Sequence, residues 1–129
     1  MTLERFNPSE LTQPGGPYVH ATRAGNLVFV SGQVAFGDDG RVVGVGDIDA
    51  QTVRVLEGVG ACLRAAGADF ADVVKVTVFL RDMAHRGAVA RVRERYFKGT
   101  NPASTLVAVS ALTHPDLLVE IEAIAVVPT

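Results

Sequence analysis

The stretch from Val119 to Val126, Val-Glu-Ile-Glu-Ala-Ile-Ala-Val, restricts the fold more than any other part of the sequence. Side chains alternate along a β-strand, so Glu120 and Glu122 point to one face and the apolar residues between them point to the other. Carboxylates in so apolar a segment are costly unless they meet a cation, water or a ligand. The pair therefore belongs either to a solvated or cross-strand-paired face or to a functional site.

The remaining patterns predict a mixture of strands and helices. We expect strands near residues 18–22, 27–34, 41–45, 73–80, 104–112 and 118–127, and helices near 49–66 and 83–97. This order, β-β-β-α-β-α-β-β, predicts an α+β domain in which both helices pack on one face of a sheet. The opposite face is too apolar for water, so a partner subunit is its natural cover.

Composition excludes several classes of function. The 129 residues fit a single domain, 1–129, and the net charge of −2 supplies no basic field for nucleic acid. A single cysteine, Cys62, suits a reducing compartment. In the helix expected near 49–66, Cys62 belongs to an apolar stripe at helical spacing that includes Val55, Val59, Leu63 and Ala66, which predicts a core residue. No signal peptide precedes the domain and no apolar stretch approaches the ~20 residues of a membrane span, so we expect a cytoplasmic protein without a membrane partner.

Metal and cofactor motifs are also missing from the sequence. The three histidines, His20, His85 and His114, have no ligand spacing among themselves or with acids, so no metal is expected. There is no glycine-rich phosphate loop and no Gly-x-Ser-x-Gly nucleophile elbow. We therefore expect a protein that works without a cofactor.

Several stretches together resemble one known family. They are Gly16-Pro17-Tyr18, Phe29–Val34, Val74–Asp82, and the closing pair Asn101–Val109 and Val119–Val126. In order and spacing, from about Pro14 to Val127, the chain is similar to the RidA (YjgF, L-PSP endoribonuclease-like) family of imine and enamine deaminases. The resemblance implies a chorismate-mutase-like fold, a homotrimer, and small-molecule sites in the clefts between subunits.

The same resemblance assigns roles to individual residues. The family hydrolyses imines derived from 2-aminoacrylate-type enamines, and by this resemblance Glu120 is the acid that positions the water. Tyr18 and Ser31 would line the pocket, and Gly32 would present its backbone to the ligand. The alternatives are structural: a packed Tyr18 ring with its hydroxyl at a wet edge, and a Ser31 hydroxyl bonded to nearby backbone.

The sequence departs from the family pattern at Pro102-Ala103-Ser104-Thr105. Ser104 stands where relatives carry the arginine that binds the substrate carboxylate, and a serine cannot replace a planar, charged fork. We therefore expect a hydrolase of the imine/enamine deaminase type with altered substrate specificity, in which Ser104 and Thr105 donate neutral hydrogen bonds. Its 2-aminoacrylate-type activity would be weak or absent.

Two further hypotheses stay open. The trimer is alternatively a non-catalytic protein that binds or senses a metabolite. In addition, Arg93 of the second helix would restore the missing charge if it reached across a subunit interface. A structural acid pair should contact Lys75 or another cation, whereas site glutamates should lie in a cleft between subunits.

Overall fold

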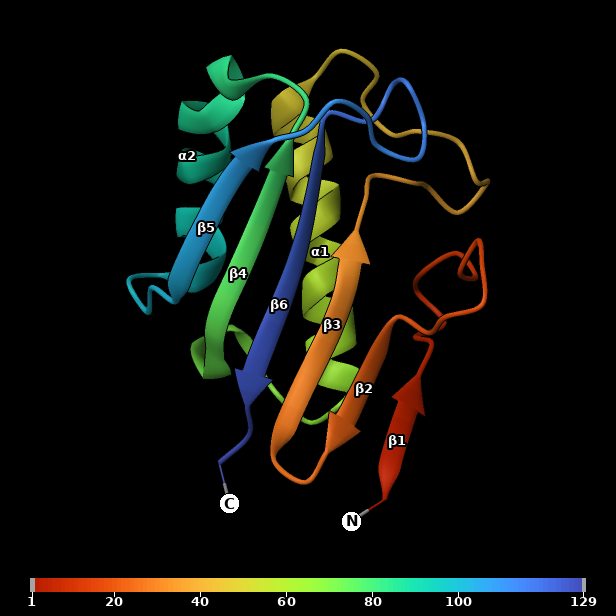
Figure 1. The fold of residues 1–129 in the computed structure, drawn as a ribbon, viewed down its shortest axis with the longest axis vertical. Helices are drawn as coiled ribbons and strands as arrows, with labels where there is room; N and C mark the ends of the chain where they lie inside the picture. The colour runs from red at the N-terminus through yellow and green to blue at the C-terminus, as the bar shows by residue number, and fades with distance from the viewer. Residues whose placement is uncertain (1, 129) are drawn as a thin grey trace.

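A computed structural model describes residues 2–128, and it shows two helices packed on one face of a six-stranded sheet (Figure 1). The strands are β1 (Leu3–Phe6), β2 (Ala21–Ala24), β3 (Leu27–Gln33), β4 (Val73–Leu80), β5 (Ala103–Ala108) and β6 (Val119–Val126). Their spatial order is β1-β2-β3-β6-β4-β5. The predicted α+β class, with both helices on the same face, is confirmed.

The centre of the sheet is β6, which pairs antiparallel with β3 on one side and with β4 on the other. The only parallel pair in the described part of the chain is β4 with β5, and the helix α2 (Arg86–Phe97) connects these two strands. A parallel pair needs a crossover connection, which explains why a helix lies between them in the sequence. β5 is therefore an edge strand whose outer side has no strand partner within residues 2–128.

The longer helix, α1 (Ile48–Ala65), begins where the Asp47 side chain accepts a hydrogen bond from the Ala50 backbone N–H, 3.0 Å away. This contact satisfies one of the free N–H groups at the helix start. The shorter helix, α2 (Arg86–Phe97), follows a single 3₁₀ turn (Met83–His85). It ends at Lys98, whose left-handed φ of 52° stops the helical hydrogen bonding.

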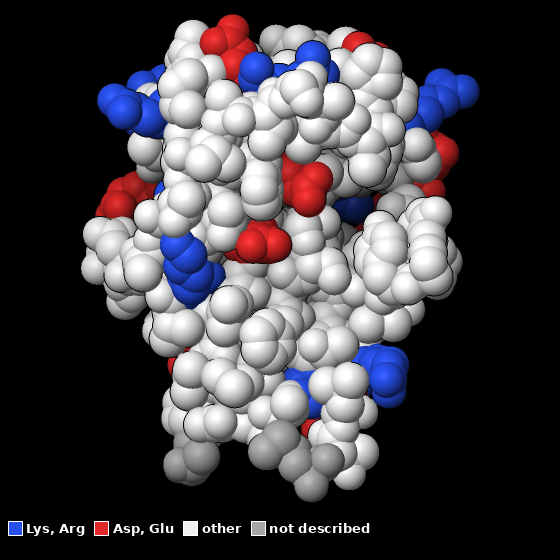
Figure 2. All heavy atoms as spheres, in the orientation of Figure 1, with Lys and Arg blue, Asp and Glu red and all other residues white. Residues whose placement is uncertain are grey.

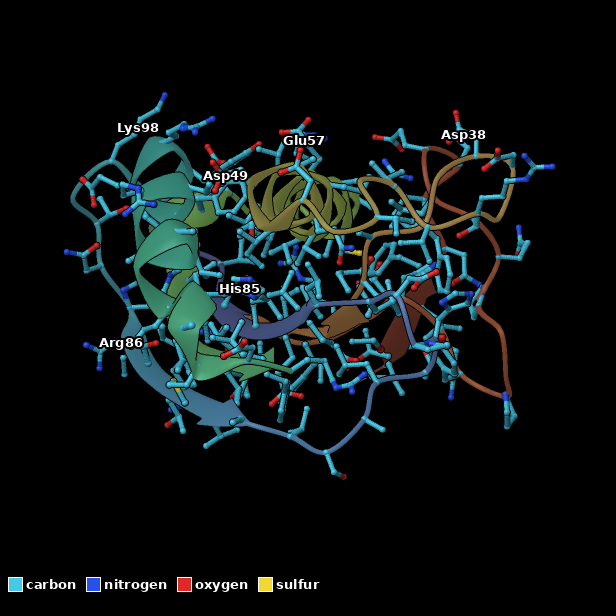
Figure 3. All side chains as sticks on the ribbon, turned by 90° about the horizontal axis from the view of Figure 1, so that it is seen from above. Asp38, Asp49, Glu57, His85, Arg86 and Lys98 are labelled. Carbon is cyan, nitrogen blue, oxygen red and sulfur yellow. The ribbon has the colours of Figure 1, made fainter. Side chains whose placement is uncertain are left out.

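The hydrophobic core fills the layer between the helices and the sheet. Viewed from above, Glu57 and Lys98 point away from the sheet, while the layer beneath the helices is filled with side chains (Figure 3). The fully buried residues of this layer include Val55, Leu56, Val59, Leu63, Val76, Val78, Leu80, Val119 and Ile121. Cys62 is buried among them, and burial raises the pKa of its thiol to about 12, in agreement with the predicted core role.

The first strands differ from prediction. The strand expected near residues 18–22 lies further along the chain, at β2 (Ala21–Ala24). A tight turn at Gly25 and Asn26, with Gly25 at φ 61°, lets β2 pair with β3 as far as Ala24. Tyr18 consequently lies in the loop before β2. The strand β1 was not predicted, since its largely exposed residues show no apolar alternation and it is held by backbone pairing with β2.

Three other expectations about the elements were also wrong: one strand does not form, one strand ends earlier, and one helix begins later than expected. Residues 41–45 form no strand and contribute only the isolated bridge between Phe36 and Val42. β5 ends at Ala108 rather than near 112, because its partner β4 ends at Leu80. The second helix begins at Arg86 rather than near 83, because the three preceding residues form the 3₁₀ turn.

A buried amide connects α1 to the segment that leads into β6. Gln51 is fully buried; its Nε2 donates to the carbonyls of Gly44 and Asp116 at 3.1 and 2.9 Å, and its Oε1 accepts from the Leu118 N–H at 2.8 Å. Because Leu118 immediately precedes β6, this amide fixes where the central strand starts.

We predict that Gln51→Leu lowers the free energy of unfolding by about 2–4 kcal/mol, because it removes three hydrogen bonds of a fully buried side chain and takes away the partner that the Asp116 carbonyl and the Leu118 N–H have in Gln51. The measurement is urea unfolding followed by circular dichroism. The matched control is Gln13→Leu, the same change at an exposed loop position, which should stay within about 0.5 kcal/mol of the wild type. Equal effects of the two substitutions would contradict the role given to Gln51.

Candidate functional site

The sheet face opposite the helices is open and mostly uncharged. Figure 2 shows this face with an acidic patch near its middle, surrounded largely by uncharged residues. Apolar side chains are exposed on it, among them Leu27, Phe29 and Val107, of which Phe29 is 43 % exposed. The acidic residues that β6 contributes to this face are Glu120 and Glu122, as the strand alternation predicted.

Glu120 is held against the backbone of the neighbouring strand at Gly32. A Cβ atom on Gly32 would overlap the Oε2 atom of the Glu120 carboxylate. The absence of a side chain at position 32 therefore provides the space in which the carboxylate lies. The pairing of β3 with β6 shifts register between Val30 and Gln33, which opens the strand at this point.

The environment of Glu120 favours its protonated form. The side chain is half-buried, and burial raises its pKa above the usual value; the negative charge of Glu122 raises it further. Within residues 2–128 neither glutamate takes part in an ion pair. A carboxyl group without a cationic partner and with a raised pKa is suited to accept and return a proton, and perturbed groups of this kind gather at functional sites.

Ser31 and Tyr18 lie on the β3 side of this carboxylate. The Ser31 Oγ donates to the Val19 carbonyl at 2.7 Å, and the Ser31 N–H donates to the His20 carbonyl at 2.9 Å. These bonds attach the segment that carries Tyr18 to β3. The Tyr18 ring is 52 % exposed and meets the His20 ring edge-on, with 6.5 Å between the centroids.

A buried polar network beneath Ser31 was not anticipated. His20 Nε2 lies 2.7 Å from the Thr12 carbonyl, and its Nδ1 lies 3.2 Å from Gln33 Nε2. Gln33 also donates to the Ser31 carbonyl at 3.1 Å. The signal available in the sequence was the glutamine directly after Ser31-Gly32, a polar residue on the core side of an apolar strand.

A shallow hollow of about 260 Å³ lies beside the glutamate pair on the open face. It is lined by Thr22, Phe29, Val30, Ser31, Glu122, Ala123 and Ile124. Glu122 and Ser31 border this hollow, whereas Glu120 lies outside its lining, next to Gly32. The hollow is open to one side, so a molecule in it would be enclosed only if something covered the sheet face.

Ser104 and Thr105 lie apart from this group, on the edge strand β5. Ser104 pairs with Val76, whose side chain faces the helices, so Ser104 is on the opposite face of the sheet from Glu120. Thr105 is on the open face, but β4 separates it from β6, which places the two backbones roughly 10 Å apart. Within one chain, these two residues do not meet the other four.

Each hydroxyl on β5 accepts a hydrogen bond from a cation. Arg93 Nη1 donates to Ser104 Oγ at 3.1 Å, and Lys75 Nζ donates to Thr105 Oγ1 at 2.6 Å. Lys75 therefore contacts Thr105 rather than the glutamates, which speaks against a structural acid pair. Arg93 contacts β5 of its own chain at Ser104, the position where the resemblance leads one to expect an arginine.

The described part of the chain lacks both a candidate metal site and a candidate membrane span. Residues 2–128 contain no group of three or more His, Cys, Asp or Glu side chains placed to hold a metal ion. None of the helices within that range is both long and apolar enough to cross a membrane.

Comparisons with known proteins show which family the chain belongs to. Residues 9–127 match the model of the family described as Endoribonuclease L-PSP. The 3-aminoacrylate deaminase RutC of Acinetobacter baylyi is 41 % identical over 125 residues, covering 97 % of this chain and 98 % of that protein. Each chain is therefore covered almost completely by the other.

Solved structures show the same similarity. A putative endoribonuclease from Thermotoga maritima has a TM-score of 0.90 and 41 % identity, covering 98 % of this chain and 99 % of its own. TdcF of E. coli, determined with bound serine, has a TM-score of 0.89 and 31 % identity, covering 97 % and 99 %. The family match over most of the chain, together with these relatives, shows that the chain belongs to the L-PSP endoribonuclease family, which includes the RutC and YjgF/Rid proteins.

Proposed function

We propose that this protein is a small-molecule hydrolase that deaminates imines formed from enamines. The observation that carries the proposal is the Glu120 carboxyl group, which lies over Gly32, has no cationic partner in the described part of the chain, and has a raised pKa. A relative that is 41 % identical is named a 3-aminoacrylate deaminase, which supports the same class of reaction.

Glu120 can serve both proton transfers that imine hydrolysis requires. Water adds to the carbon of the C=N bond while the Glu120 carboxylate takes one of its protons. When the imine nitrogen is protonated, this addition gives a neutral carbinolamine. The same carboxyl group then returns its proton to the nitrogen, the C–N bond breaks as the C=O bond forms, and the hydroxyl proton leaves with the ammonia as ammonium. A group that must give and take a proton near neutral pH works best when its pKa is raised towards that range.

The complete site requires a second copy of the chain. Glu120, Gly32, Ser31 and Tyr18 form one half on the open face and the preceding loop, and β5 carries the other half at the edge of the sheet. Exposed apolar residues on the open face give a second copy a surface to cover. We propose a homotrimer in which the β5 edge of one subunit faces the Glu120 half of the next, with the ligand between them.

One observation favours a second function, the binding of a metabolite without turnover. TdcF, a relative of known structure, holds a serine molecule. The alternative is therefore a trimer that binds or senses a small amino-acid-like molecule.

We predict that Glu120→Gln abolishes deamination, lowering kcat by at least about 100-fold, because the amide cannot accept the proton of the attacking water. Imines would be generated in situ by an amino-acid oxidase and their hydrolysis followed as ammonia release. Gly32→Ala should also inactivate, because its Cβ displaces the carboxylate. The control is Gly15→Ala, where an added Cβ meets nothing within 4 Å.

Two outcomes of this assay would contradict the proposed function. If Glu120→Gln retained wild-type turnover, Glu120 would not be the proton-transfer group. If the wild type hydrolysed no imine from either carboxylate-bearing or neutral precursors, the non-catalytic alternative would replace the enzyme.

We predict that Glu122→Gln shifts the acid limb of the pH profile of kcat/KM to lower pH. The charge on Glu122 raises the pKa of Glu120, so its removal lets Glu120 ionise at lower pH and keeps the base form available further into the acid range. The measurement is kcat/KM for one imine from pH 4 to 8. An unchanged or upward-shifted limb would show that the two carboxyl groups are not coupled.

We predict that Phe29→Glu weakens assembly of the trimer, because it places a charge on the apolar open face. Sedimentation velocity over a range of protein concentrations would reveal smaller species for this variant. Val45→Glu is the matched control, at a side chain that is 63 % exposed and outside the sheet. A wild-type protein that is monomeric at all concentrations would contradict the composite site.

A further inference from the structure

Arg93 on α2 is a half-buried cation that has no acidic partner among residues 2–128. Other arginines have one: Arg41 lies near Asp39, Arg54 near Asp38 and Arg64 near Glu10. No carboxylate within residues 2–128 comes within ion-pair distance of Arg93. Its only side-chain hydrogen bond in the described structure goes to the neutral hydroxyl of Ser104.

The guanidinium of Arg93 is held in place on two sides. Ser104 accepts its Nη1 hydrogen at 3.1 Å, and its Cζ lies 5.7 Å from the centroid of the Phe97 ring. Burial lowers the pKa of the group from its usual value, although an arginine stays charged at neutral pH. Moving this charge out of water costs free energy, and the contacts with the Ser104 hydroxyl and the Phe97 ring compensate for only part of that cost.

An anion is the missing partner that this arrangement fits. A guanidinium has five N–H donors in a planar fork, and Ser104 uses one of them. A carboxylate with two parallel oxygens matches the fork better than any single acceptor does. The tip of Arg93 is at β5, beside the exposed Ser104, so a small ligand can reach it from the edge of the sheet.

We propose that Arg93 is the carboxylate-binding residue of this protein, and that Ser104 is a positioning residue that holds its guanidinium at the β5 edge. The inference rests on the proposed function and names its substrate class, imines that carry a carboxylate. The charge is supplied by the helix instead of by the strand, and the small side chain at position 104 leaves room for it. In the trimer, Arg93 of one copy and Glu120 of the next hold the two ends of the same substrate.

The first test compares Arg93→Met with Arg91→Met, an exposed arginine on the same helix. We expect Arg93→Met to lower kcat/KM about 100-fold for carboxylate-bearing imines and less than about 3-fold for neutral ones, because a bidentate, charge-assisted contact is lost. Arg91→Met should match the wild type on both. If the two variants behaved alike, the proposal would be overturned.

The second test moves the cation back to the strand. Ser104→Arg alone places two guanidinium groups side by side, so it should not improve carboxylate-bearing substrates. The double variant Arg93→Ser with Ser104→Arg carries one cation at the same place, and we expect its preference for carboxylates to return to within about 10-fold of the wild type. If the double variant stayed as poor as Arg93→Met, the anion would not bind at this edge, and the proposal would fail.

The third test measures binding without turnover. Pyruvate, a 2-oxo acid of the kind such a reaction releases, is titrated by calorimetry into the wild type, Arg93→Met and Arg91→Met, with acetone as the neutral probe. We expect pyruvate to bind the wild type and Arg91→Met, and to bind Arg93→Met at least about 30-fold more weakly.

These readouts separate the inference from the proposed function. Pyruvate binding that needs Arg93 in a protein that hydrolyses no imine would support the inference and contradict the hydrolase. Imine turnover that is indifferent to Arg93 would support the hydrolase and overturn the inference. A wild type with neither pyruvate binding nor a preference for carboxylates would also overturn it.

Discussion

The structure depends on the double pairing of β6. This strand is hydrogen-bonded to β3 and β4 along both edges, so its position is fixed across the middle of the sheet. One face of the strand supplies Val119, Ile121 and Ala123 to the core beneath the helices. The same rigid backbone therefore supports Glu120 on the other face, where a loop would have left the carboxylate free to move.

The fold was largely predictable because apolar periodicity carries it. The strand alternation of 119–126 and the helix stripe of α1 both derive from burial against one core, and both were found correctly. The strand β1 escaped prediction because three of its four residues are exposed, so burial imposes no pattern on them, while the backbone pairing with β2 that holds them is the same for every residue type. The bridge at Phe36 and Val42 replaced an expected strand because positive-φ glycines at 40 and 44 turn the chain.

The candidate site was predictable only in part. The family resemblance implied that Glu120, Gly32 and Ser31 belong to one site, and the structure places Glu120 directly against Gly32, the residue after Ser31. It did not indicate that Ser104 would lie on the helix side of the sheet, or that Thr105 would lie two strands away from Glu120. Distance along the chain does not reveal which face or edge of the sheet a residue occupies. The contact of Arg93 with Ser104 could not be predicted either, because a long side chain of one element reaches a residue of another. Apolar periodicity predicts which residues are buried, but it does not predict such contacts.

The contact between α2 and β5 has a consequence for the evolution of the family. An arginine at position 104 would place a second guanidinium beside that of Arg93, and the two like charges would repel each other. Substitution at one position therefore changes which residues selection tolerates at the other. Across relatives, we expect positions 93 and 104 to vary as a correlated pair, and classifying members by residue 104 alone would divide proteins that share a charge.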